Sequence, residues 1–170
     1  MEDSRERLLR YLNDCWAAEK ALVDTLKEMA EDSNDPQVRT LFQEHSQITW
    51  QQEESLEARI RALGEEPSRG KGWVNSLMGK VADLFNAGHD EYDKTTQNLI
   101  QAYATENLEI AMYESLASYS DAIGDTETAA LARQIQQQER QTAERLWPHV
   151  QRCAARAVAA TEIGGTAEAA

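Results

Sequence analysis

The sequence predicts an all-α protein built as a bundle of four long helices. Ala, Glu, Gln, Leu and Arg are abundant, and all of them are good helix formers. The 170 residues include only 3 Pro and 8 Gly, so few positions interrupt a helix. Apolar residues recur at alternating steps of three and four in four long segments, which is the spacing of a helix that faces a bundle core. The length suits one domain with a packed core.

The first helix is predicted from about Ser4 to Ala30, and it ends at the sequence EDSNDP. Its apolar stripe consists of Leu8, Leu12, Cys15, Leu22, Leu26 and Met29. Glu19 occupies the step that is missing from this stripe. A carboxylate in a buried stripe needs a partner.

The second helix is predicted to begin at Asp35 and Pro36, an N-cap residue followed by proline at the first helical position. Gly64 and Pro67 end it. Its stripe is formed by Leu41, His45, Ile48, Gln52, Leu56, Ile60 and Leu63, in which His45 and Gln52 are the polar members.

The stretch between the second and third helices is predicted to carry a short amphipathic fifth helix. Seven apolar residues crowd into 13 positions at helical spacing: Trp73, Val74, Leu77, Met78, Val81, Leu84 and Phe85. A large apolar surface usually marks an interface, so we expect a homodimer in which this segment takes part. The alternative is that the segment caps one end of the bundle.

The third helix is predicted over Glu91 to Ile123, with Gly124 as its break, and the fourth from about Asp125 to Ala157. Pro148 should kink or loosen the last turns. The two stripes consist of Leu99, Tyr103, Glu106, Ile110, Tyr113 and Ala117, and of Leu131, Ile135, Glu139, Thr142, Leu146 and His149. Residues 1–157 therefore form the predicted bundle, and residues 158–170, which are small and polar, form a predicted disordered tail.

The connections predict the topology. Short links join the first helix to the second and the third to the fourth, so each pair forms an antiparallel hairpin. About 25 residues separate the hairpins, enough to cross a helix that is roughly 40 Å long. Two hairpins joined by one long crossover are the ferritin-like arrangement.

Polar residues interrupt all four stripes at matching heights near the middle of the bundle. They are Glu19, His45, Gln52, Glu106, Glu109 and Glu139. Each unpaired buried ion costs several kcal/mol, and no Lys or Arg falls on the stripes at this level. Either a divalent cation neutralises the carboxylates, or some of them are protonated and bonded to Tyr103, Tyr113, Gln52 or Thr142.

Composition excludes several other classes of protein. The net charge of −13 repels phosphate backbones, so no nucleic acid is expected as a partner. The two cysteines lie in no close-spaced motif, and the N-terminal residues MEDSRERLL are charged, unlike a signal peptide. No run approaches 18 apolar residues, so no membrane span is expected. A cytoplasmic location is the resulting expectation.

The chain resembles the YciE/YciF-type ferritin-like family. The similar pieces are AAEKAL, LFQEHSQIT followed by ALGEEP, ENLEIAMY and QQQERQTAERL, which together span about residues 5–148. The resemblance implies a ferritin-like bundle, often dimeric, with a di-metal centre and a link to bacterial stress responses. It implies metal ligation by Glu19, His45, Glu106, Glu109 and Glu139.

The chain also departs from the family pattern. Gln47 and Ile48 stand where the family usually has a Glu pair, Asn107 replaces a His, and Ala143 replaces an Asp. The hypotheses therefore include an iron-type di-metal site, a single-cation site, and an empty residual site. A metal-free structural or interaction protein of the stress response is the alternative function, and whether the protein is an enzyme stays open.

Overall fold

The computed structural model describes residues 3–68 and 91–167, with side chains for residues 3–68 and 94–156. This part of the chain contains four α-helices and no strand: α1 (Ser4–Asp32), α2 (Pro36–Ala62), α4 (Glu91–Ile123) and α5 (Thr126–Ala167). The predicted all-α class is confirmed. The short helix predicted near residues 73–85 lies outside the described residues, and the homodimer that depends on it stays a prediction.

Local sequence signals position the helix ends. Asp3 caps α1 in a capping box with Glu6, and Asp35 caps α2 with Pro36 in the first turn. Gly64 and Gly124 both have a φ of 82°, a left-handed conformation that glycine adopts without steric cost. The second helix begins where the sequence predicts, and the third has the predicted bounds.

The fourth helix is longer than expected. The sequence predicts an end near Ala157, whereas the backbone of α5 stays helical to Ala167. Pro148 lies inside α5, and the helix continues past it. Within 158–170 the structure describes only this backbone to residue 167, so the disordered tail stays a prediction.

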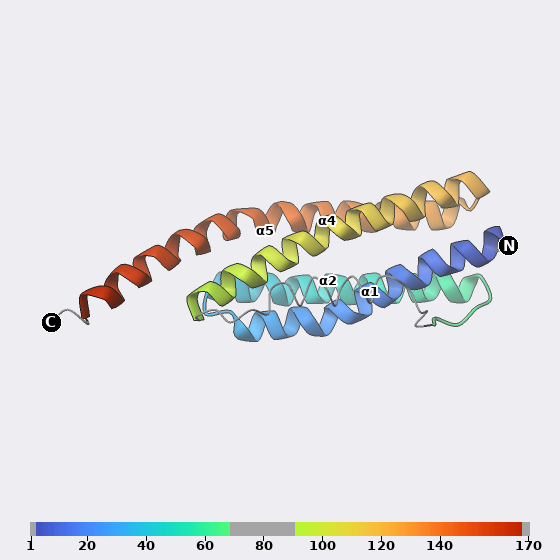
Figure 1. Cartoon of the computed structure of the whole chain (residues 1–170). Helices are drawn as coiled ribbons and strands as arrows, with labels where there is room; N and C mark the ends of the chain where they lie inside the picture. The colour runs from blue at the N-terminus through green and yellow to red at the C-terminus, as the bar shows by residue number, and fades with distance from the viewer. Residues whose placement is uncertain (1–2, 69–90, 168–170) are drawn as a thin grey trace.

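The helices form two antiparallel hairpins that pack face to face. Figure 1 shows the α1–α2 hairpin along one side and the α4–α5 hairpin along the other, with the C-terminal part of α5 extending beyond the end of the bundle. Between the hairpins, α1 packs on α4 and α2 packs on α5. Helix α4 therefore begins at the end of the bundle where α1 and α2 are joined. One long crossover between the two hairpins requires this arrangement.

The hydrophobic core is divided into two clusters along the bundle. The first contains Leu8, Leu12, Cys15, Trp16, Ala18, Leu56, Ile60, Met112, Tyr113, Leu116, Ala117, Ala132 and Ile135. The second contains Leu22, Leu26, Met29, Ala30, Val38, Leu41, Phe42, Leu99, Ala102, Leu146 and Cys153. On every helix, the polar residues singled out in the sequence lie between the two clusters.

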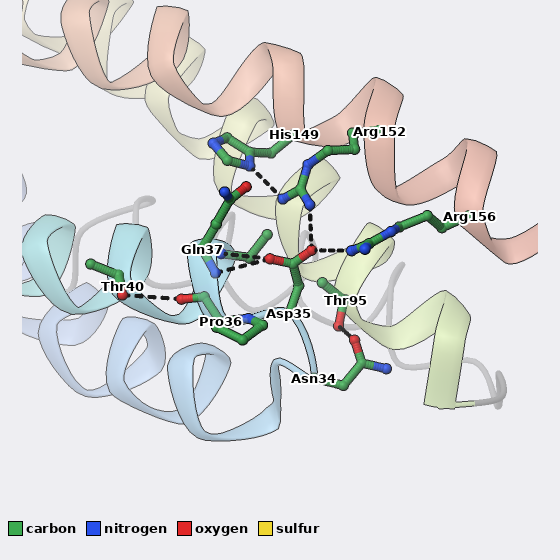
Figure 2. Close-up of polar contacts among 10 residues, drawn as sticks. Asn34, Asp35, Pro36, Gln37, Thr40, Thr95, His149, Arg152 and Arg156 are labelled. Atoms are coloured by element: carbon green, nitrogen blue, oxygen red, sulfur yellow. Dashed lines mark hydrogen bonds and ion pairs between the residues drawn. The ribbon is translucent and has the colours of Figure 1, made fainter.

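Charged groups tie the hairpins together at both ends of the bundle. Asp35 Oδ1 caps α2, while Asp35 Oδ2 accepts hydrogen bonds from Arg152 at 2.5 Å and Arg156 at 2.6 Å on α5 (Figure 2). At the opposite end, Arg59 of α2 pairs with Asp125 at 2.7 Å, in the turn between α4 and α5. These contacts fix the position of one hairpin along the bundle axis relative to the other. That position determines which residues of the two hairpins face each other at mid-bundle.

Candidate metal centre

The polar layer lies at mid-bundle, as its spacing predicts, and it is almost closed to solvent. Glu106 is 0 % exposed, Glu19 and Glu139 are 1 %, Glu109 is 2 % and His45 is 3 %. All four helices contribute, because each places a polar residue on its inner face at this height. The neighbouring Gln52 and Thr49 of α2 are equally buried.

His45, Glu106 and Glu139 form the tightest group in this layer. Each offers one ligand atom, and the three atoms all lie within 4.8 Å of one another. His45 Nε2 and Glu106 Oε1 are 3.0 Å apart, yet neither atom has a hydrogen-bond partner within the described part of the chain. The absence of a hydrogen bond at this short distance means that the imidazole nitrogen and the carboxylate oxygen are not aligned as donor and acceptor.

The spacing of these atoms suits a common cation. Two ligand atoms that sit about 2.1 Å from a metal at a right angle are about 3.0 Å apart. An imidazole nitrogen with two carboxylates is a ligand set used for divalent first-row metals. The residues present therefore fit a metal.

Unpartnered polar atoms concentrate in the same layer. Among the described side chains, ten buried nitrogen or oxygen atoms lack a hydrogen-bond partner, and six of them belong to His45, Gln52, Glu106 and Glu109. A buried polar group without a partner costs about 1–3 kcal/mol. Such a concentration is expected where the missing partner is a ligand.

The remaining contacts orient the carboxyl groups. The Tyr113 hydroxyl donates to Glu19, and the Gln52 side-chain amide donates to Glu139 and, at 3.2 Å, to Gln138. Tyr113 and Gln52 are thus confirmed as the predicted partners of the carboxyl groups. Tyr103 instead packs against the Trp147 ring, with centroids 5.0 Å apart.

Burial dominates the electrostatics of the metal-free layer. Burial raises the pKa of Glu106 to about 8. Burial also raises the pKa of Glu139 to about 9, and the charge of Glu106 adds to this second shift. Burial, followed by the charges of neighbouring carboxylates, holds the pKa values of Glu19 and Glu109 well above the usual value for glutamate. Without a cation, the carboxyl groups therefore retain protons at neutral pH.

His45 shifts in the opposite direction. Burial lowers its pKa to about 4, because the apolar surroundings disfavour the imidazolium ion. The ring is therefore neutral at physiological pH, which is the form that binds metals. A cation that entered this layer would meet a neutral imidazole and carboxyl groups able to release protons.

The five predicted ligands thus divide into two sets. His45, Glu106 and Glu139 converge on one point, whereas Glu19 and Glu109 flank them within electrostatic range. The ligand assignment itself stays a prediction. His149 of the fourth stripe lies inside α5, ten residues or about 15 Å of helix beyond Glu139, and its Nδ1 contacts Arg152 at 2.9 Å (Figure 2).

Sequence reasoning missed two features near the layer. Gln138 supports Gln52 from α5, although it lies just off the predicted stripe. Cys15 lies one turn before Glu19, and its place in the apolar stripe predicts only a core residue. Burial and the charges of Glu19 and Glu109 raise the pKa of the Cys15 thiol, which places it beside the carboxylates. Only the packed structure distinguishes these residues from their neighbours.

None of the described helices combines the length and hydropathy that a membrane crossing would require. No curated protein sequence matches the chain. The structure is similar to that of protein XCC3681 from Xanthomonas campestris, with a TM-score of 0.73, 28% identity, and coverage of 96% of this chain and 99% of that one.

Two further solved structures show the same fold at lower identity. The stress protein YciF from E. coli has a TM-score of 0.79 at 20% identity, covering 91% of this chain and 98% of that chain. Dps from Thermosynechococcus elongatus has a TM-score of 0.73 at 18% identity, covering 86% and 92%. The fold is ferritin-like, and the resemblance to YciF-type proteins is confirmed. With residues 3–159 matched, the chain belongs to the family described as "Domain of unknown function (DUF892)".

Proposed function

We propose that this protein binds a divalent metal cation of iron type in the centre of its bundle, with His45, Glu106 and Glu139 as the first ligands. The observation that carries the proposal is the convergence of the three ligand atoms without hydrogen bonds between His45 and Glu106. A structural polar layer would satisfy those atoms with protein donors and acceptors. A cation satisfies them together and offsets the carboxylate charge.

Glu19 and Glu109 extend the proposal to a second cation. Both carboxyl groups are buried beside the triad, and the charge of Glu139 acts on both. Glu19 and Glu109, together with Glu139, would hold this second cation beside the first, as carboxylates do in di-metal bundles. When bound, such ions would supply redox or Lewis-acid chemistry.

The alternative is a metal-free structural or interaction protein in which the layer keeps its protons. The bonds from Tyr113 to Glu19 and from Gln52 to Glu139 are compatible with it. In it, the protonated carboxyl groups of Glu106 and Glu139 would hydrogen-bond to each other, but both ring nitrogens of His45 would still lack a partner among the described residues, which is why we favour metal binding. A role in the stress response extends the proposal by analogy with YciF, which is described as a stress protein.

Metal content separates these functions. The experiment is elemental analysis of protein purified without a chelating tag, followed by Co²⁺ titration of the metal-free form. Glu106→Gln should abolish tight binding, because the amide keeps the shape of the protonated acid and loses the anionic ligand. Glu109→Gln is the matched variant on the same helix, and it should retain one bound ion.

The stoichiometry of the wild type decides between one site and two. Two ions in the wild type and one in Glu109→Gln would indicate the di-metal form, whereas one ion in both would indicate the single-cation form. Wild-type protein that binds no Co²⁺, Fe²⁺ or Mn²⁺ would overturn the proposal in favour of the metal-free alternative.

A further inference from the structure

A cation that binds in this layer needs a route through the bundle, because the five predicted ligands are at most 3 % exposed. Two grooves between described helices approach the layer. One lies between α1 and α4, with a volume of ≈ 290 Å³, and the other lies between α2 and α5, with a volume of ≈ 530 Å³. Each groove is lined by one carboxylate and one arginine, and the grooves differ in how that carboxylate is held.

The α1–α4 groove comes within one helical turn of the carboxylates. It is lined by Arg10, Tyr11, Asp14, Cys15, Leu108, Ala111, Met112 and Ser115. Its floor is formed by Cys15, which is 3 % exposed, and Met112, which is 8 % exposed. Cys15 lies one helical turn before Glu19, and Met112 lies one turn after Glu109, so about 5 Å along the helix axis separates this floor from the layer.

Asp14 marks the same groove as a cation path. Its side chain lines the groove, the residue is only 6 % exposed, and its Oδ2 atom has no hydrogen-bond partner among the residues described. A buried carboxylate oxygen without a donor is costly, and a passing cation or its water supplies the missing contact. Burial raises the pKa of Asp14, and the Arg10 charge partly opposes this effect.

Cys15 links Asp14 to the layer. The charges of Glu19, Glu109 and Asp14 all raise the pKa of its thiol, after burial as the main cause. Cys15 and Met112, the most buried groove residues on α1 and α4, therefore lie between the groove and the layer.

The α2–α5 groove is less suited to a cation. It is lined by Pro36, Gln37, Thr40, Leu41, Glu44, Arg145 and His149. Its one carboxylate, Glu44, is already paired with Arg145. His149 Nδ1 contacts the Arg152 guanidinium at 2.9 Å (Figure 2). The α2–α5 groove therefore offers an incoming cation a carboxylate that is already paired, whereas Asp14 Oδ2 in the α1–α4 groove has no hydrogen-bond partner among the described residues.

We propose that the α1–α4 groove is the entrance through which a divalent cation reaches the carboxylate layer, with Asp14 as the first carboxylate that it meets and Cys15 and Met112 as the passage. This inference rests on the proposed metal binding. It predicts a kinetic role for residues that are not ligands. A change in the entrance alters the rates of metal binding and release by the same factor and leaves the affinity unchanged.

The test is stopped-flow Co²⁺ binding to the metal-free protein, together with release into excess chelator. Ala111→Phe fills the α1–α4 groove from an exposed position, and Thr40→Phe is the matched variant that fills the α2–α5 groove. Ala111→Phe should slow both association and release about tenfold, whereas Thr40→Phe should leave both rates within about twofold of the wild type. Asp14→Asn should slow association about tenfold without adding bulk.

The outcomes separate the two proposals. Wild-type protein that binds Co²⁺ at equilibrium while Ala111→Phe and Asp14→Asn keep wild-type rates would overturn the entrance alone. Slower Co²⁺ binding in Thr40→Phe than in Ala111→Phe would assign the entrance to the α2–α5 groove and would also overturn the proposed α1–α4 entrance. Absence of equilibrium binding in the wild type would overturn the proposed function. Ser115→Tyr fills the same groove from a second exposed position and replaces Ala111→Phe if that variant does not fold.

Discussion

Glu19 illustrates how a single residue is stabilised inside an apolar core. Its carboxyl group is 1 % exposed and accepts a hydrogen bond from the Tyr113 hydroxyl, itself 1 % exposed. Burial raises the pKa values of both groups far above their usual ranges. In the absence of metal, the pair is therefore a neutral hydrogen-bonded unit, which is the form that a low-dielectric environment favours.

A double-mutant cycle tests this pairing in the presence of chelator. Glu19→Leu leaves the Tyr113 hydroxyl without an acceptor, and Tyr113→Phe removes the donor to Glu19, so each single change should destabilise the fold. The double variant removes both polar groups and should be at least as stable as the wild type. The coupling between the two changes should be about 1–3 kcal/mol in urea unfolding. Additive single effects would contradict the pairing.

Residues of the layer could be predicted from the sequence because each one breaks an apolar stripe at a matching height. Asp14 could not, because it lies beside the stripe and resembles any surface acid of this acidic chain. Its burial arises from the approach of α4, which no local pattern encodes. The close approach of His45 Nε2 to Glu106 Oε1 without a hydrogen bond likewise depends on side-chain orientation. The periodicity of the sequence does not determine that orientation.

At the scale of the helices, Asp35 performs two tasks with one side chain. Oδ1 accepts backbone hydrogen bonds from Gln37 at 2.9 Å and Val38 at 3.3 Å, and Oδ2 accepts from two arginines of α5. These donors lower its pKa to about 2, with the Arg152 hydrogen bond as the largest cause. The group therefore stabilises the fold above its unfolded pKa of about 3.9, and this contribution is lost as pH falls through about 2.

Substitution of Asp35 should separate the cap from the ion pairs. Asp35→Ala loses both and should lower the free energy of unfolding by about 2–3 kcal/mol. Asp35→Asn keeps a capping oxygen and should cost about 1 kcal/mol. Asp24→Ala, which removes an exposed acid of α1, is the control and should change stability by less than about 0.5 kcal/mol. Equal losses for the two Asp35 variants in urea unfolding would show that the cap contributes little.

The predicted bounds of the helices are mostly correct because capping residues and glycines are local signals. The sequence predicts the end of the fourth helix near Ala157 because the residues that follow are small and polar, whereas the backbone of α5 stays helical to Ala167. Pro148, which the sequence expects to kink or loosen the last turns, lies inside α5, and the Arg152 and Arg156 contacts to Asp35 hold the turns that follow it against α2. Such tertiary contacts override a local preference.

At the scale of the whole molecule, the polar layer separates two hydrophobic clusters that would otherwise form one continuous core. Each cluster is built from all four helices, so the hairpins are held together above and below the layer. The layer therefore contributes little to folding by itself and can be tuned for a ligand. Its protonation state should nevertheless be visible in the stability of the whole protein.

The pH dependence of stability should reverse when metal binds. In the metal-free protein, the pKa values of Glu106 and Glu139 are raised to about 8 and about 9, above an unfolded value of about 4.3. The folded state then holds more protons, so stability is highest on the acid side and falls as pH rises through this window. His45, with a pKa lowered to about 4, opposes this trend only below its unfolded value of about 6.5.

Bound metal should reverse the slope, because it keeps the carboxylates ionised and protons compete with it for the ligands. Stability in excess divalent metal should therefore rise between about pH 5 and pH 8, whereas stability in chelator should fall over the same interval. Urea midpoints for the wild type and for Glu106→Gln would measure both slopes. The variant should show a shallower fall in chelator, since one titrating group is gone, and little response to metal. Slopes of the same sign in metal and in chelator would mean that the buried glutamates do not share a cation, because only a ligand that displaces their protons can invert the linkage.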